Sequence, residues 1–102
     1  MENKLEDTYK ITEIYFTHIK PIKGLIGFVS LVINENLFFG GIAVYTKLDK
    51  KGYRISYPFR KTSNTTFNYY HPITKDLSAY FENIITKEVE RQMILVARDF
   101  IA

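Results

Sequence analysis

The sequence predicts an α+β domain in which an antiparallel sheet of four to five strands precedes one C-terminal helix. Three observations carry this prediction. Short runs rich in β-branched and aromatic residues, separated by turn residues, fill the chain between residues 11 and 70. The apolar spacing then changes to that of a helix, and about 25 residues follow without Gly or Pro. Strands first and a helix last are typical of a sheet that carries its helix on one face.

Length and composition set the outer limits of the prediction. The 102 residues fit one domain, which we place at residues 10–102 behind a flexible N-terminal arm at residues 1–9. There is no cysteine, so disulfides and thiolate metal sites are excluded and a cytoplasmic location is favoured. No apolar stretch approaches the roughly 20 residues that span a membrane, and we expect no membrane partner.

Five extended segments are expected, at residues 11–19, 25–33, 37–47, 53–57 and, more briefly, 66–70. Turn residues from Lys20 to Gly24 end the first segment, and Asn34 to Asn36 predict a tight antiparallel connection between the second and third. Gly40 and Gly41 predict a bulge or bend inside the third strand. Pro58 ends the fourth because it cannot donate to a ladder, and Arg60 to Thr65 is expected to be a polar loop.

The second strand, Leu25 to Ile33, carries apolar side chains on both of its faces. Such a strand is central in its sheet or covered on its second face. In a domain this small, a partner subunit could supply that cover.

The helix should begin after Thr74, a plausible N-cap, and its apolar stripe is irregular. Its first half places Leu77, Phe81 and Ile85 on one stripe, whereas its second half turns the apolar residues about a quarter turn round. Either the helix breaks into two near residues 86–88 or its second half packs on something different. Residues 93–97 are apolar nearly all round, which fits either a subunit interface or a segment folded back on its own sheet.

Catalytic chemistry has no visible basis in the residues. No nucleophile is paired with a base, no glycine loop precedes a helix, and the two histidines, His18 and His71, have no clustered metal-ligating neighbours. We therefore expect no enzyme, no cofactor, no metal and no small-molecule substrate. His71 is expected to bind backbone at a strand-to-helix junction.

The charge is more informative. The net charge is +3, and residues 1–73 hold ten Lys and Arg against six Asp and Glu. A basic surplus is a mild indication of a polyanionic partner. Arg60 and Lys61 follow Pro58, and Lys87 and Arg91 lie opposite the first apolar stripe of the helix. The alternative is a solvated charged face and a tyrosine-rich core.

One series of short motifs is more specific. It consists of Ile42-Ala43-Val44, Lys51 to Pro58, Arg60-Lys61-Thr62, Phe67, and His71-Pro72-Ile73 directly before the helix. In this order the motifs resemble those of the stage V sporulation protein G (SpoVG) family, and the resemblance covers most of residues 10–91.

The resemblance implies an α+β homodimer that binds DNA, and in some members RNA, as a regulator linked to septation and sporulation. Carried onto this chain, it implies nucleic-acid contacts at Arg60, Lys61 and Lys75, whereas Lys87 and Arg91 come from the helix-face argument alone. The alternative function is a dimeric protein-interaction module of cell division that binds no nucleic acid.

Overall fold

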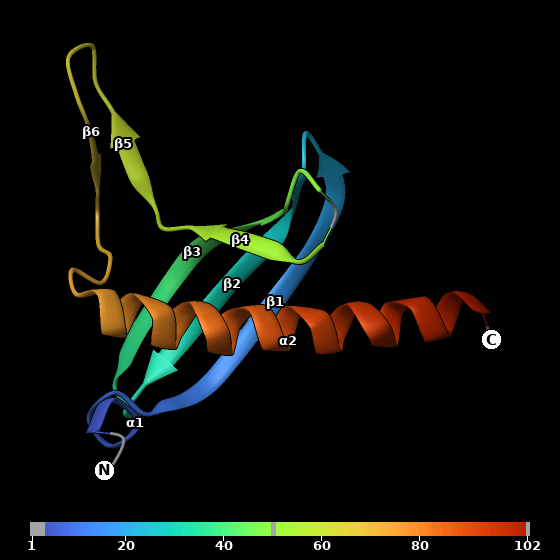
Figure 1. The fold of residues 1–102 in the computed structure, drawn as a ribbon, viewed down its shortest axis with the longest axis horizontal. Helices are drawn as coiled ribbons and strands as arrows, with labels where there is room; N and C mark the ends of the chain where they lie inside the picture. The colour runs from blue at the N-terminus through green and yellow to red at the C-terminus, as the bar shows by residue number, and fades with distance from the viewer. Residues whose placement is uncertain (1–3, 50, 102) are drawn as a thin grey trace.

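The computed structural model describes residues 4–49 and 51–101, and within them the side chains of residues 5–49 and 51–97. Its elements are α1 (Lys4–Thr8), β1 (Ile11–Ile22), β2 (Leu25–Ile33), β3 (Leu37–Thr46), β4 (Tyr53–Ser56), β5 (Phe59–Lys61), β6 (Thr66–Asn68) and α2 (Lys75–Ile101). Four strands form an antiparallel sheet in the order β1-β2-β3-β4, helix α2 crosses one face of it, and the β5–β6 hairpin stands apart (Figure 1). The α+β class and the antiparallel sheet with a C-terminal helix are thus as the sequence predicts.

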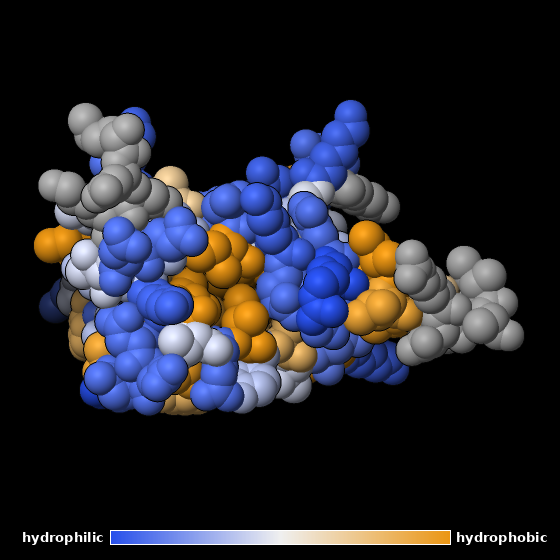
Figure 2. Space-filling model, turned by 90° about the horizontal axis from the view of Figure 1, so that it is seen from below, coloured by the Kyte–Doolittle hydropathy of each residue, from blue (hydrophilic) through white to orange (hydrophobic). Residues whose placement is uncertain are grey.

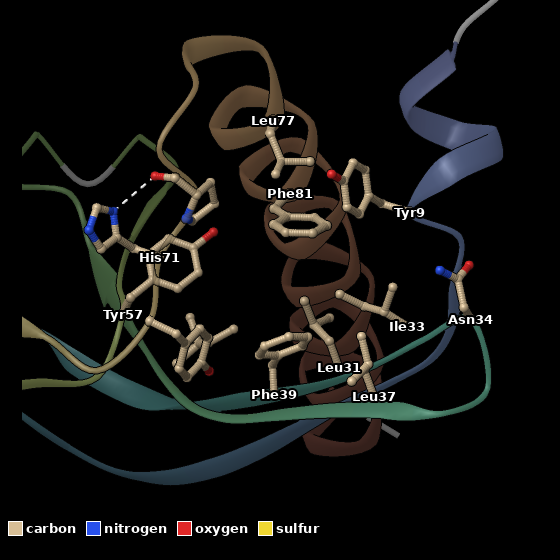
Figure 3. Close-up of a pocket in the computed structure, with 13 residues that line it drawn as sticks. Tyr9, Leu31, Ile33, Asn34, Leu37, Phe39, Tyr57, His71, Leu77 and Phe81 are labelled. Carbon is tan, nitrogen blue, oxygen red and sulfur yellow. Dashed lines mark hydrogen bonds between the residues drawn. The ribbon is translucent and has the colours of Figure 1, made fainter.

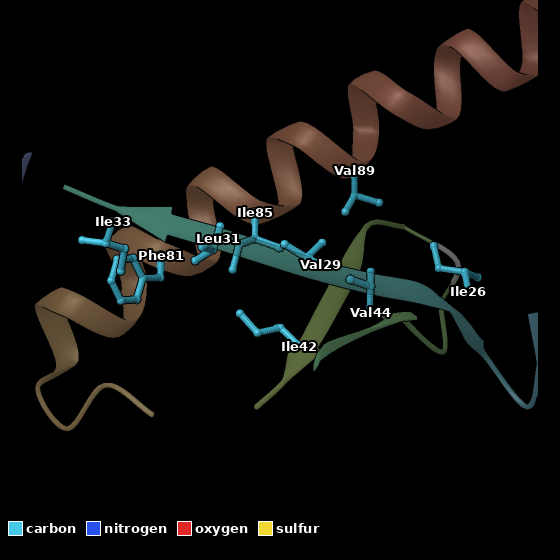
Figure 4. Close-up of a cluster of buried hydrophobic side chains, with 9 residues drawn as sticks. All are labelled: Ile26, Val29, Leu31, Ile33, Ile42, Val44, Phe81, Ile85 and Val89. Atoms are coloured by element: carbon cyan, nitrogen blue, oxygen red, sulfur yellow. The ribbon is translucent and has the colours of Figure 1, made fainter. Parts of the chain in front are cut away.

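The core lies between the sheet and α2 (Figure 4). Strands β2 and β3 direct β-branched and leucine side chains towards α2, and helix residues at intervals of four pack against them. The buried apolar residues are Ile26, Val29, Leu31, Ile33, Ile42, Val44, Phe81, Ile85 and Val89. Each step of four along a helix rotates the side chain by about 40°, so a straight helix that crosses the strands obliquely needs a drifting stripe. Since α2 is continuous, this drift accounts for the irregular apolar stripe that the sequence shows.

Helix α2 begins as expected and runs without interruption to Ile101. The hydroxyl oxygen of Thr74 accepts a hydrogen bond from Leu77 N at 3.3 Å, which confirms the N-cap. The C-terminal half extends past the edge of the sheet (Figure 1), where Ile94 and Leu95 are 55% and 41% exposed. The apolar surface beside the C-terminal end is orange at the right of Figure 2. The described residues of this half are therefore not folded back on the sheet.

The connection from β2 to β3 follows the prediction. Asn34 and Glu35 both have positive φ, and Asn36 N donates to Ile33 O at 3.1 Å, the geometry of a type I′ turn. Further along, the register between β2 and β3 shifts where Ser30 faces Gly40 and Gly41. Gly41 has φ +74°, so the expected bulge is confirmed and needs its glycine.

Two predictions about the chain path are wrong. Strand β1 continues through Lys20 and Pro21 to Ile22, and only Lys23 and Gly24 turn the chain. Proline is tolerated there because β1 is an edge strand of the sheet. Arg60 and Lys61 do not lie in a polar loop but in β5, which pairs with β6 as an antiparallel hairpin.

The end of the predicted N-terminal arm, at Tyr9, contacts α2; residues 1–3 of the arm lie outside the described residues. Helix α1 leads into Tyr9, whose ring meets that of Phe81 edge-on with 6.5 Å between ring centroids. The hydroxyl of Tyr80 donates to the carbonyl of Tyr9 at 2.9 Å. The end of the arm is thereby tied to α2.

The face of the sheet opposite α2 carries no helix (Figure 1). Cross-strand pairing places four apolar side chains on it, which together we call the open face: Tyr15, Phe28, Val32 and Phe38. Of these, Tyr15 is 53% and Phe38 68% exposed. Strand β2 is thus central, and none of the described residues covers the second of its apolar faces.

Candidate nucleic-acid interface

The β5–β6 hairpin projects well beyond the main sheet (Figure 1). Its register pairs Phe59 with Asn68, Arg60 with Phe67 and Lys61 with Thr66. Its tip is closed by Thr62 N, which donates to Thr65 O at 2.7 Å, and by Thr65 N, which donates to the Thr62 hydroxyl at 3.1 Å. The tip is therefore an ordered turn in which the amides of Thr62 and Thr65 are both satisfied locally.

The root of the hairpin is fixed to the body of the protein. Tyr69 N donates to Pro58 O at 2.9 Å, and the side-chain amide of Asn68 donates to Tyr57 O at 3.2 Å. The hydroxyl of Tyr70 donates to the carbonyl of Gly40 at 2.6 Å, inside the β3 bulge. An isolated two-stranded hairpin is marginal in water, so these root contacts orient it.

The two faces of the hairpin differ in composition. Paired residues share a face, so Arg60 lies with Phe67, and Tyr69 joins them through an edge contact with Phe67 at 6.0 Å between centroids. Lys61 and Phe59 point to the other face. All five side chains are exposed, and the aromatic ones by 45% to 64%. Arg60 thus lies beside two exposed aromatic rings on one face, and Lys61 lies beside one ring on the other.

Lys75 lies at the start of α2, directly after the N-cap, and is exposed. The start of α2 and the root of the hairpin lie on the same side of the molecule (Figure 1). The structure therefore places Arg60, Lys61 and Lys75 at one end of the protein, around the hairpin and its base.

Lys87 and Arg91 lie elsewhere. At 1.5 Å per residue they are about 18 and 24 Å along the helix axis from Lys75, on the face that points away from the sheet. Arg91 is also paired: its Nη2 and Nε donate to the two oxygens of Glu88 at 2.7 and 3.1 Å. This bidentate hydrogen bond lowers the pKa of the Glu88 carboxyl, so its negative charge is present at neutral pH and offsets that of Arg91.

The five residues expected to contact nucleic acid thus form two separate groups, and all five are exposed. Sequence reasoning missed the exposed aromatic residues of the hairpin, Phe59 and Phe67. A signal existed after the Thr62 to Thr65 turn, where polar and aromatic residues alternate from Thr66 to Tyr69. This run is only four residues long, too short for the alternation to stand out.

Tyrosines near this region divide into two kinds. Tyr69 is 64% exposed and available for stacking, whereas Tyr57 and Tyr70 are half-buried against the body. Burial raises the pKa of Tyr70 to about 12. His71 lies at the junction before α2, with its Nδ1 2.9 Å from Pro72 O, so the prediction of a backbone-bound histidine is confirmed.

Over residues 4–49 and 51–101, no group of three His, Asp or Glu side chains is placed to hold a metal ion. The helices in the same part of the chain are too short or too polar to cross a membrane. No protein-family model matches the chain, and neither does any curated protein.

Proposed function

We propose that this chain is a nucleic-acid-binding regulatory protein of the SpoVG type, which binds DNA, and RNA by the same contacts, in the cytoplasm. The observation that carries the proposal is the projecting β5–β6 hairpin, on which cationic and aromatic side chains are exposed together. The resemblance of the motifs to the SpoVG family adds the regulatory role and its link to septation and sporulation.

The chemistry of the hairpin suits an unpaired strand. The guanidinium of Arg60 can bind phosphate, and on the same face Phe67 and Tyr69 offer rings on which bases can stack. Stacking needs bases that are free of a duplex, so we propose a preference for single-stranded regions. Lys75 extends the cationic surface from the hairpin towards the start of the helix.

The remaining predicted contacts have a weaker role in this proposal. Lys87 is exposed on the outer face of α2, and a strand that follows the helix would reach it. The charge of Arg91 is offset by the carboxylate of Glu88, which accepts hydrogen bonds from its Nε and Nη2 atoms, so its attraction for phosphate is reduced. We therefore rank Arg60 and Lys61 above Lys87, and Lys87 above Arg91.

A dimer is part of the proposal. The open face and the exposed Ile94 and Leu95 on α2 leave apolar surface in water in a single chain. A second copy that covers either surface would remove this cost and bring two hairpins into one particle.

The experiment is fluorescence anisotropy with labelled random-sequence oligonucleotides, as single-stranded DNA, single-stranded RNA and duplex DNA, over a salt series. We expect binding to all three, tighter to the single strands, that weakens as salt rises. Absence of binding at the lowest salt, in a protein that co-purifies with no nucleic acid, contradicts the proposal.

The second candidate is a dimeric protein-interaction module in cell division. The exposed rings of Phe59 and Phe67 favour it, because aromatic side chains also anchor protein interfaces. A preparation that forms dimers by light scattering yet binds none of the three oligonucleotides would support this candidate over the first.

A further inference from the structure

A cavity of about 220 Å³ lies between the first turns of α2, strands β2 and β3, and the junction of α1 with β1 (Figure 3). Most of its wall is apolar, with Leu31, Ile33, Phe39, Ile42, Leu77 and Phe81 turned towards it. An apolar cavity of about 150 Å³ is enough to take up benzene, so this one is large enough for a bicyclic molecule.

One polar group inside the wall has no partner. The hydroxyl of Tyr57 is buried and makes no hydrogen bond within the described residues. Figure 3 shows the ring of Tyr57 reaching into the cavity towards α2. Burial, with smaller contributions from Tyr70 and Glu82, raises the pKa of Tyr57 to about 12, so the hydroxyl keeps its proton at neutral pH and can donate it. A buried donor of this kind is costly unless something accepts from it.

Of the other polar side chains around the cavity, three are already engaged, and the fourth, Tyr9, is 37% exposed. The hydroxyl of Tyr70 donates to Gly40 O at 2.6 Å. The side chain of Asn34 accepts from Lys10 N at 3.1 Å and donates to Thr8 O at 3.0 Å. The Nδ1 atom of His71 bonds Pro72 O, and its exposed ring is turned away from the centre of the cavity (Figure 3). Within the described wall, Tyr57 thus carries the buried hydroxyl that is left to bind a ligand.

The electrostatics of the wall indicate the charge of that ligand. None of the described residues that line the cavity is Lys, Arg, Asp or Glu. The neighbouring carboxylate of Glu82 is among the groups that disfavour negative charge at the Tyr57 oxygen. A carboxylate or phosphate would therefore be both unpaired and repelled, and a cation would find no carboxylate among the lining residues.

We propose that this cavity is a binding site for a small neutral molecule of one or two fused rings that carries a single hydrogen-bond acceptor, held by the Tyr57 hydroxyl. The rings of Phe39, Phe81 and Tyr57 offer flat contact surfaces on several sides. None of its lining residues is one of the hairpin cations, so the site does not overlap with the proposed nucleic-acid contacts.

The test uses two probes that differ only in the acceptor: 1-indanone, which has a ring carbonyl, and indane, which lacks it. Binding is followed by methyl NMR of the full chain, in which Leu31, Ile33, Ile42 and Leu77 report on the cavity. We expect indanone to shift these methyl signals with a Kd of about 0.1–1 mM, as suits a molecule of this size.

Two variants locate the probe. Tyr57→Phe keeps the ring and should weaken indanone roughly three- to tenfold, the effect of one neutral hydrogen bond, while leaving indane unchanged. Leu37→Trp, at an exposed position on the rim, should weaken both probes alike. Circular dichroism checks that both variants are folded.

Three results would overturn the proposal. One is the absence of cavity methyl shifts with either probe, and another is a Tyr57→Phe variant that binds indanone as well as the wild type does. The third is a set of cavity signals that follow protein concentration instead of probe concentration, since a side chain of a second copy would then occupy the cavity.

Discussion

Reversing the charge of the two hairpin cations one at a time, as Arg60→Glu and Lys61→Glu, should have unequal effects. The two residues are consecutive in β5 and therefore point to opposite faces of the hairpin. Only Arg60 shares a face with Phe67 and Tyr69. A single strand that stacks on those rings would meet Arg60 and pass Lys61 by.

The magnitude follows from counterion release. The slope of the logarithm of the binding constant against the logarithm of salt concentration reports how many phosphates are neutralised. A variant that neutralises one phosphate fewer should have a slope smaller in magnitude by about 0.7 with a single strand and by about 0.9 with duplex DNA. We expect Arg60→Glu to show this full change with single-stranded DNA, and Lys61→Glu to show a clearly smaller one. The assay is anisotropy titration at several salt concentrations.

A matched control is available at the opposite end of the sheet. The double variant of Lys20→Glu with Lys23→Glu changes two exposed lysines in and next to the β1–β2 turn. It makes the same change in net charge as a double reversal at Arg60 and Lys61. Slopes that flatten equally in the control would mean that net charge alone drives binding. Equal effects of the two single hairpin variants would refute the stacked geometry, since both faces would then contact phosphate.

Three further predictions concern stability. Ile85→Ala should lower the free energy of unfolding, measured by urea titration, by about 2–5 kcal/mol because Ile85 is fully buried. Ile94→Ala, at a 55% exposed position, should change it by less than about 0.5 kcal/mol in dilute protein. Similar decreases in the two variants would contradict the core assignment. Tyr70→Phe should lower the free energy of unfolding by about 0.5–1.5 kcal/mol because it removes the hydrogen bond to Gly40. Tyr57→Phe should leave that free energy unchanged or raise it, because it removes an unpaired buried hydroxyl. The reverse order would show that Tyr57 has a partner. The pKa of both tyrosines is raised from 10.0 to about 12 in the folded protein, so the unfolded chain loses these protons at a lower pH. The free energy of unfolding should therefore fall as pH rises from about 10 to 12. A titration of tyrosinate absorbance in which all tyrosines titrate near pH 10 would contradict this.

The sheet could be predicted because its signals are local. Asn34 adopts positive φ readily and begins a short polar run that indicates a tight turn, and the paired glycines of β3 indicate a bulge. The continuity of α2 was also predictable in principle. Apolar residues recur at intervals of four throughout the helix, which indicates an oblique crossing and requires no break.

The candidate site was harder to predict because it depends on contacts between distant segments. The bond from Tyr70 to Gly40 joins residues thirty positions apart, and no pattern near either residue indicates it. The pairing of Arg91 with Glu88 is different, since the two are three positions apart on one helix and the sequence alone could have shown it. The cavity had no sequence signal, because it is a property of how α2 lies across the sheet.

The bulge in β3 and the direction of the hairpin form a single structural device. Gly40 and Gly41 interrupt the regular pairing with β2, which leaves the carbonyl of Gly40 free to accept from the Tyr70 hydroxyl. Beside it, Gly41 brings the backbone close to Pro58, where a Cβ atom would stand 3.5 Å from the proline ring. Pro58 and Tyr70 are the residues at which the chain enters and leaves the hairpin region. The direction of the hairpin, which does not pair with the main sheet, is therefore set by contacts with strand β3 of that sheet. If the hairpin binds a partner, a rigid base of this kind reduces the entropy that is lost when the hairpin is ordered on binding.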